Sequence, residues 1–180
     1  KHQRIQTDNS QGTIRDIALN GTGQLYLLIS SSYGDQFESS NFIMIYNPES
    51  EGEELQEIML PMSMDGAIDP GTMFIRGANN IYLTEKYSGT IYRLNDQIGS
   101  PIELSPIIGN DFCTGNCSVS VGKSARDIYL PEVSDIDLST DGKLRVSVRW
   151  LQALDKAGVI TFTETLEDEW IVSEITSLNW

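Results

Sequence analysis

The chain has 180 residues, which is enough for one domain of ordinary size or for a piece of a larger protein. It carries 12 Lys and Arg against 26 Asp and Glu. The resulting formal net charge of −14 repels phosphate backbones and acidic lipid surfaces, which argues against a nucleic-acid or membrane-surface role. No apolar stretch approaches the roughly 20 residues of a transmembrane helix. The only histidine, His2, is close to the first residue, which argues against a Ser-His-Asp or Cys-His catalytic arrangement.

Three segments repeat one pattern: an alternating apolar strand, a turn rich in Gly, Asn or Asp, and a second apolar strand. They span residues 16–27, 72–83 and 135–146. Asn-Gly and Asp-Gly tolerate the positive φ that tight turns require, so each segment is predicted to be a β-hairpin.

Two further strand-like segments follow each hairpin. They are 41–46 and 55–60, then 90–94 and 101–104, then 159–162 and 170–175. Four short antiparallel strands per repeat are typical of the blades of a β-propeller. The sequence therefore predicts an all-β fold, a single β-propeller segment (1–180) with three four-stranded antiparallel repeats at approximately 14–60, 71–105 and 133–176. A flat β-sandwich is the alternative, but it would not predict the same cycle three times.

The second repeat carries the most specific likeness to a known family. Its segment Asn80–Arg93 resembles the second and third strands of a blade in the six-bladed β-propeller superfamily (YWTD, NHL-repeat and gluconolactonase-like). Tyr82-Leu83-Thr84-Glu85 stands where a Tyr-Trp-Thr-Asp signature would, and Ile91-Tyr92-Arg93 matches the Ile-x-Arg that closes the pattern. The resemblance implies a six-bladed ring, of which three repeats would be half. The other half would come from a second copy, another chain or further sequence, and a stable open arc is the alternative.

The longest predicted connection runs from 105 to 133, and connections of this length are commonly functional or disordered. It holds the only two cysteines, Cys113 and Cys117, which we expect to form a local disulfide in an oxidising compartment. Free thiols are the main alternative, because a Cys-x₃-Cys pair lacks the other ligands of a zinc site and the spacing of a redox motif. The pair predicts an extracytoplasmic location (secreted, periplasmic or cell surface). The start at Lys1, without Met or a signal pattern, is expected for a processed or excised piece.

Two charged patterns have both a functional and a structural interpretation. Asp135-x-Asp137-x-Ser139-x-Asp141-Gly142 opens like a calcium-binding loop, but the Glu at its twelfth position is missing. We therefore favour a strand followed by an Asp-Gly hairpin, keep Ca²⁺ as the weaker alternative, and expect no other cofactor or metal. The tripeptide Arg-Asp-Ile occurs at 15–17 and at 126–128, where it would either line the mouth of a ring or brace neighbouring strands.

The candidate binding residues are Tyr33 and Phe37, in a Ser-rich connection, and Asp111 and Asp127, in the long connection. No catalytic residue is predicted. These features favour a non-catalytic module for protein–protein interaction or assembly. Its partner would be another protein or a second copy that completes the propeller. We expect neither a nucleic-acid partner nor membrane insertion. The resemblance also implies an alternative: a fragment of a divalent-metal-dependent gluconolactonase-like hydrolase, although the Glu-Gly-Pro signature of that branch is absent.

Overall fold

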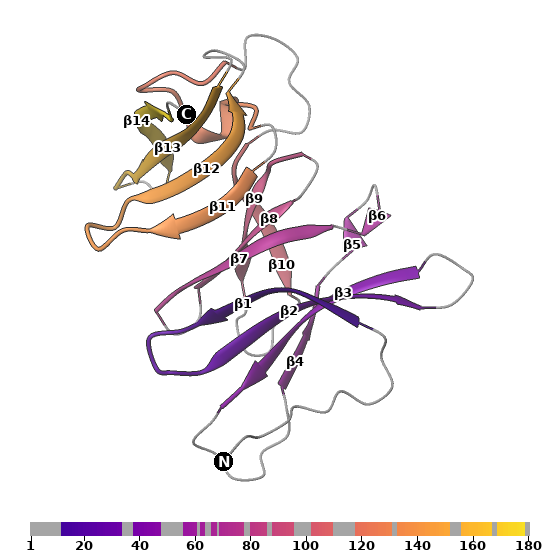
Figure 1. The fold of residues 1–180 in the computed structure, drawn as a ribbon. Coiled ribbons are helices and arrows are strands. Elements are labelled where there is room, and N and C mark those ends of the chain that lie inside the picture. The colour runs from indigo at the N-terminus through magenta and orange to yellow at the C-terminus, as the bar shows by residue number, and fades with distance from the viewer. Residues whose placement is uncertain are drawn as a thin grey trace.

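The alternating segments form three four-stranded antiparallel sheets, which confirms the predicted all-β fold with its three four-stranded repeats (Figure 1). The computed structural model describes residues 12–33, 38–47, 56–60, 62–63, 66–67, 69–77, 80–85, 88–95, 102–109, 118–130, 133–151, 156–166 and 169–178. Within these residues there is no α-helix, and so none that is long and apolar enough to cross a membrane.

In each sheet the strands lie in their sequence order. Sheet 1 consists of β1 (Gly12–Leu19), β2 (Leu25–Tyr33), β3 (Glu38–Tyr46) and β4 (Gln56–Met59). Sheet 2 consists of β7 (Pro70–Arg76), β8 (Asn80–Glu85), β9 (Ile91–Asn95) and β10 (Glu103–Ile108). Sheet 3 consists of β11 (Val133–Leu138), β12 (Leu144–Leu151), β13 (Lys156–Glu164) and β14 (Trp170–Ser177). A short pair, β5 (Met62–Ser63) with β6 (Gly66–Ala67), lies between sheets 1 and 2 in the sequence.

The hairpin turns are built by the polar residues that predicted them. The Asn20 side-chain oxygen accepts hydrogen bonds from the backbone N–H of Thr22 at 3.0 Å and of Gln24 at 2.9 Å. The turn between β11 and β12 is closed by the Gly142 N–H, which donates to the Ser139 carbonyl at 2.9 Å. Gly142 has φ of 81°, the left-handed conformation that glycine adopts without a steric cost.

The three repeats also share an irregularity in the first strand of each sheet. The pairing register shifts between Ile14 and Asp16 in β1, between Pro70 and Met73 in β7, and between Val133 and Asp135 in β11. After the shift, Ile17 pairs with Leu27, Met73 with Leu83, and Ile136 with Val146. The hairpins are therefore equivalent residue by residue, as well as in their apolar pattern.

The first strands β1, β7 and β11 lie side by side in that order, and their sheets follow one another (Figure 1). Each sheet thus has a leading face, turned toward the next sheet in the sequence, and a trailing face, turned the opposite way. Successive residues of a strand point to opposite faces. Sheet 2 packs apolar side chains on both faces: Met73 and Ile75 pack against sheet 1, whereas Phe74 and Tyr82 pack against sheet 3.

Two apolar clusters join the sheets. The cluster between sheets 1 and 2 is formed largely by Tyr26, Leu28, Ile43, Ile45, Ile58, Met73, Ile75, Ile81, Leu83 and Leu94. The cluster between sheets 2 and 3 is formed largely by Tyr82, Ile91, Ile108, Ile128, Leu130, Ile136, Leu144, Val146, Val148, Ile160, Phe162, Trp170 and Val172. Burial of this apolar surface is the main favourable contribution to folding.

Part of the long connection is an ordered piece of sheet 3. The Gly122 N–H donates to the Val172 carbonyl at 2.8 Å, and the Val172 N–H donates to the Lys123 carbonyl at 3.0 Å. Residues 121–124 therefore continue sheet 3 beyond β14, and the 3₁₀ turn η1 (Ala125–Asp127) packs against β10 and β14. Ile128 and Leu130 follow and are buried between sheets 2 and 3.

Candidate functional site

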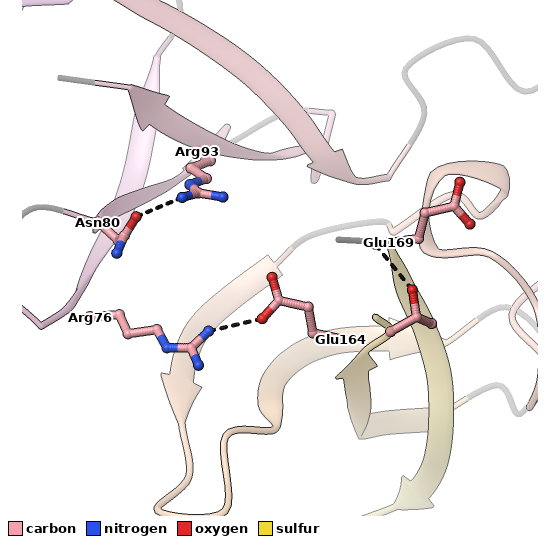
Figure 2. A network of polar contacts seen from close by, with 6 residues as sticks. Arg76, Asn80, Arg93, Glu164 and Glu169 are labelled. Carbon is pink, nitrogen blue, oxygen red and sulfur yellow. Dashed lines mark hydrogen bonds and ion pairs between the residues drawn. The ribbon is translucent and has the colours of Figure 1, made fainter. Parts of the chain in front are cut away.

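A group of polar side chains, here called the arginine cluster, lies between sheets 2 and 3 (Figure 2). It comprises Arg76, Asn80 and Arg93 from sheet 2 and Glu164 from β13 of sheet 3, all labelled in Figure 2, together with Tyr82 of sheet 2. An Arg76 Nη1 atom lies 3.0 Å from Glu164 Oε2, and Arg93 Nη2 donates to Asn80 Oδ1 at 2.8 Å. The four side chains from sheet 2 alternate with apolar neighbours along β7, β8 and β9, so these four lie on the leading face of sheet 2.

The charges of the arginine cluster do not balance. Arg76 has Glu164 as its partner. The hydrogen bond that Arg76 donates to that carboxylate, with a smaller contribution from the Tyr82 hydroxyl, raises the pKa of Arg76. Arg93 has an amide, Asn80, as its partner and forms no ion pair with any carboxylate in the described residues. Its Nε atom is buried and has no acceptor there. An unsatisfied buried donor costs about 1–3 kcal/mol. Among its described residues, the cluster therefore has one costly unpaired donor, and its two guanidinium groups have one carboxylate between them.

A second polar joint connects sheet 1 to sheet 2. Asp16 Oδ2 accepts a hydrogen bond from the Met73 backbone N–H at 2.6 Å, while Asp16 Oδ1 accepts one from its neighbour Ile17 at 2.8 Å. Arg15 Nη2 lies 3.8 Å from Asp69 Oδ1, just before β7. These contacts agree with the bracing interpretation of the first Arg-Asp-Ile tripeptide.

The second copy of that tripeptide has a different structure. Arg126 and Asp127 belong to η1 and are exposed, and the Arg126 N–H donates to the Ser124 hydroxyl at 3.4 Å. Ile128 is buried in the cluster between sheets 2 and 3. The same three residues therefore serve as part of a strand in one place and as a 3₁₀ turn in the other.

On the trailing face of sheet 1 the β1 edge is exposed. Leu27, Ile29, Phe42 and Met44, on the same face in β2 and β3, are buried. Ile17 is equivalent to Met73 and to Ile136, and these two are each 5% exposed because the preceding sheet covers them. Ile17 is 57% exposed, and Leu19, the equivalent of the buried Ile75, is 65% exposed. Ile14, on the same strand, is 54% exposed. We call Ile14, Ile17 and Leu19 the exposed row of β1.

The leading face of sheet 3 is polar where the other leading faces are apolar. Tyr26 and Tyr82 occupy one equivalent position, at which sheet 3 has the exposed Arg145. Phe74 occupies another, at which sheet 3 has the exposed Asp137, paired across the strands with Arg145. The two outermost faces of the described structure therefore have opposite chemistry: an exposed apolar row on sheet 1 and charged side chains on sheet 3.

Of the four binding residues predicted from the sequence, the structure describes Tyr33 and Asp127, which belong to different elements. Tyr33 is the last residue of β2 in sheet 1, and Asp127 lies in η1, next to sheet 3. Phe37 and Asp111 lie outside the described residues, as do Cys113 and Cys117 of the expected disulfide.

The residues of the calcium-like pattern form the favoured hairpin. Asp135 and Asp137 belong to β11, and the Ser139 hydroxyl donates to Asp141 Oδ1 in the turn. Lys143 Nζ lies 3.2 Å from Asp141 Oδ2. The Ser139 hydrogen bond, followed by that of Lys143, lowers the pKa of Asp141 from 3.8 to about 2. In the part of the chain that the structure describes, no three His, Cys, Asp or Glu side chains are grouped as a metal site would require.

The arginine cluster was not predicted as a site. Arg93 was singled out only for its place in the Ile-x-Arg pattern, and nothing in the sequence relates Arg76 to Glu164, which are 88 residues apart. Comparison of the chain with family models, curated proteins and solved structures found no match.

Proposed function

We propose that this chain is a run of three propeller-type blades and that it serves as a non-catalytic module for protein–protein assembly, outside the cytoplasm. One observation carries the proposal: Ile17 and Leu19 are exposed at positions whose equivalents, Met73, Ile75 and Ile136, are covered by a neighbouring sheet. Contiguous exposed apolar side chains on a soluble protein commonly mark an interaction site. The order of strands within each sheet and the adjacent first strands support the assignment as blades.

The chemistry of the two end faces favours a particular arrangement. In a ring closed head to tail by two copies, the exposed row of β1 would face Asp137 and Arg145 of the other copy's sheet 3. That contact would remove Asp137 and Arg145 from water and place them against apolar side chains, and the loss of hydration of the two charged groups costs free energy even though they are cross-strand neighbours. Contact between the two rows of β1 is self-complementary, as a two-fold dimer requires. The proposed partner is therefore a second copy, joined through sheet 1.

The size of the contact predicts weak association. Full burial of a large aliphatic side chain contributes about 1.5–3 kcal/mol, and these side chains are roughly half exposed. Six such side chains from two copies contribute on the order of 6 kcal/mol, before the cost of association is subtracted. Two chains of net charge −14 also repel each other, so the dimer should strengthen as salt screens the repulsion.

Sedimentation equilibrium tests the proposal. We expect the wild type to dimerise reversibly, more strongly in 500 mM than in 20 mM NaCl, and the Ile17→Lys/Leu19→Lys variant to be monomeric. Val121→Lys is the matched control, because Val121 is a comparably exposed apolar residue on a different surface. A wild-type protein that stays monomeric at high concentration in both salts would refute the second copy as the partner, and an equal loss of dimer in the control would refute the assigned surface.

A further inference from the structure

We infer that the arginine cluster is a binding site for a carboxylate group, held by Arg93 and Asn80 beside Arg76. The site lies between sheets 2 and 3, away from the exposed row of β1, so this inference is independent of the proposed assembly. It concerns the chemical group that is recognised. That group could belong to a small organic acid or to an acidic side chain of a polypeptide.

The first argument is the supply of donors. A guanidinium group has five N–H donors, and Arg93 directs one of them to Asn80 in the described structure. Its buried Nε has no acceptor. Asn80 accepts through its oxygen, which leaves its NH₂ group available, since no hydrogen bond from it is recorded in the described residues. A site rich in donors and short of acceptors suits a ligand whose atoms only accept, as those of a carboxylate do.

The second argument is charge. Two guanidinium groups and one carboxylate, Glu164, leave one positive charge among the described residues of the arginine cluster. Glu169, also labelled in Figure 2, donates from its backbone N–H to Thr165 and forms no ion pair with an arginine of the described residues. A monoanion balances this charge, whereas a phosphate dianion would over-compensate it. The chain as a whole repels anions, but salt screens distant charges over about 8 Å, so the adjacent guanidinium groups dominate inside the cluster.

The third argument is access. Arg93 is half-buried, and the side chains of Arg76 and Glu164 are 39% and 25% exposed. A small acid arriving from solvent therefore meets the partly exposed guanidinium groups, and contact with the buried Arg93 Nε–H requires the Arg93 side chain to rotate. In Figure 2 dashed lines join the Glu164 carboxylate to Arg76 and Arg93 to Asn80.

The test follows the Arg93 Nε–Hε signal in ¹H–¹⁵N NMR spectra of the whole chain. Separate titrations use sodium acetate, the peptide Gly-Glu-Gly with blocked termini, and inorganic phosphate. We expect a saturable shift with acetate and with the peptide. If the peptide half-saturates at a concentration at least tenfold lower than acetate, the source is a polypeptide; comparable values indicate a small acid. Either result supports the inference.

Variants separate binding from a structural role of the arginine. Arg93→Lys should abolish the saturable response, followed on neighbouring backbone amides, whereas Arg149→Lys, at an exposed arginine of β12, should not. Glu164→Gln removes the competing carboxylate and should tighten acetate binding roughly fivefold, the size of a partly screened charge interaction. The inference is overturned if no titration saturates, if phosphate binds more tightly than acetate, or if Glu164→Gln leaves the acetate affinity unchanged.

Discussion

Replacement of Gly89 by alanine should destabilise the chain far more than an ordinary loop substitution. Gly89 has φ of +68°, and a Cβ atom placed on it would lie 1.6 Å from the carbonyl oxygen of Leu130. The oxygen belongs to backbone, so the clash cannot be relieved by a side-chain rotation. The segment that places Leu130 and Ile128 in the cluster between sheets 2 and 3 would have to move.

The magnitude of this effect has two separable parts. A left-handed conformation costs a non-glycine residue roughly 1–2 kcal/mol. Displacement of Leu130 forfeits much of the roughly 1.5–3 kcal/mol that burial of a leucine contributes. Gly89→Ala should therefore lower the free energy of unfolding by about 2–5 kcal/mol. Gly142→Ala is the matched control, because Gly142 has φ of +81° and nothing within 4 Å of the added Cβ. It should cost only the conformational part, about 1–2 kcal/mol.

Urea unfolding, followed by the fluorescence of the tryptophans, measures both variants. Trp170 is buried in the cluster that contains Leu130, so its emission reports on this region. Equal losses of stability for Gly89→Ala and Gly142→Ala would refute the reasoning, because they would show that Leu130 does not hold its place against residue 89.

Two further predictions concern single carboxylates. Asp16→Ala should lower the free energy of unfolding by about 1–3 kcal/mol, because it leaves the buried Met73 N–H without its acceptor. Asp135→Ala, which removes a local bond to Ile136 at 2.9 Å in an exposed site, should cost less, and chemical denaturation of both variants compares them. The Asp141 carboxyl should titrate at a pKa of about 2 in NMR spectra of the folded chain, and Ser139→Ala should raise that value toward 3.8. Because the folded-state pKa is depressed, the stabilisation from Asp141 is complete above pH of about 4 and is lost as the pH falls toward 2.

The last two predictions have definite contrary outcomes. Equal destabilisation by Asp16→Ala and Asp135→Ala would show that the bond to Met73 adds nothing to the joint between sheets 1 and 2. An Asp141 pKa that Ser139→Ala leaves unchanged would show that the serine hydroxyl is not the main cause of the shift.

Much of the fold could be predicted because its signals are local. Asn20 and Asp141-Gly142 specify tight turns within a few residues, and alternating apolar residues specify the strands beside them. The equivalence of the three hairpins followed from the same spacing. These features need no knowledge of what lies across the sheet, so a single sequence was sufficient for them.

The contacts between sheets could not be predicted in this way. Arg76 and Glu164 meet because two sheets are stacked, and a charged residue at a strand end does not indicate which strand will face it. Residues 118–130 lie in the predicted connection 105–133, and the sequence did not indicate that residues 122–124 within it pair with β14. The Arg-Asp-Ile tripeptide illustrates the same limit: the residues around it decide whether it extends or turns.

The pairing of residues 121–124 with β14 has a consequence for biosynthesis. β14 is the last strand of the described chain, and residues 121–124 are translated well before it. While the polypeptide emerges from the ribosome, these residues lack the strand against which they finally rest. Ile128 and Leu130, which follow them, depend on sheet 3 for their cover as well. Sheets 1 and 2 can assemble during translation, whereas the closure of sheet 3 must wait until translation has passed residue 172. Removal of the residues after 166 would delete β14 and would therefore also damage residues 121–130, which are synthesised long before it.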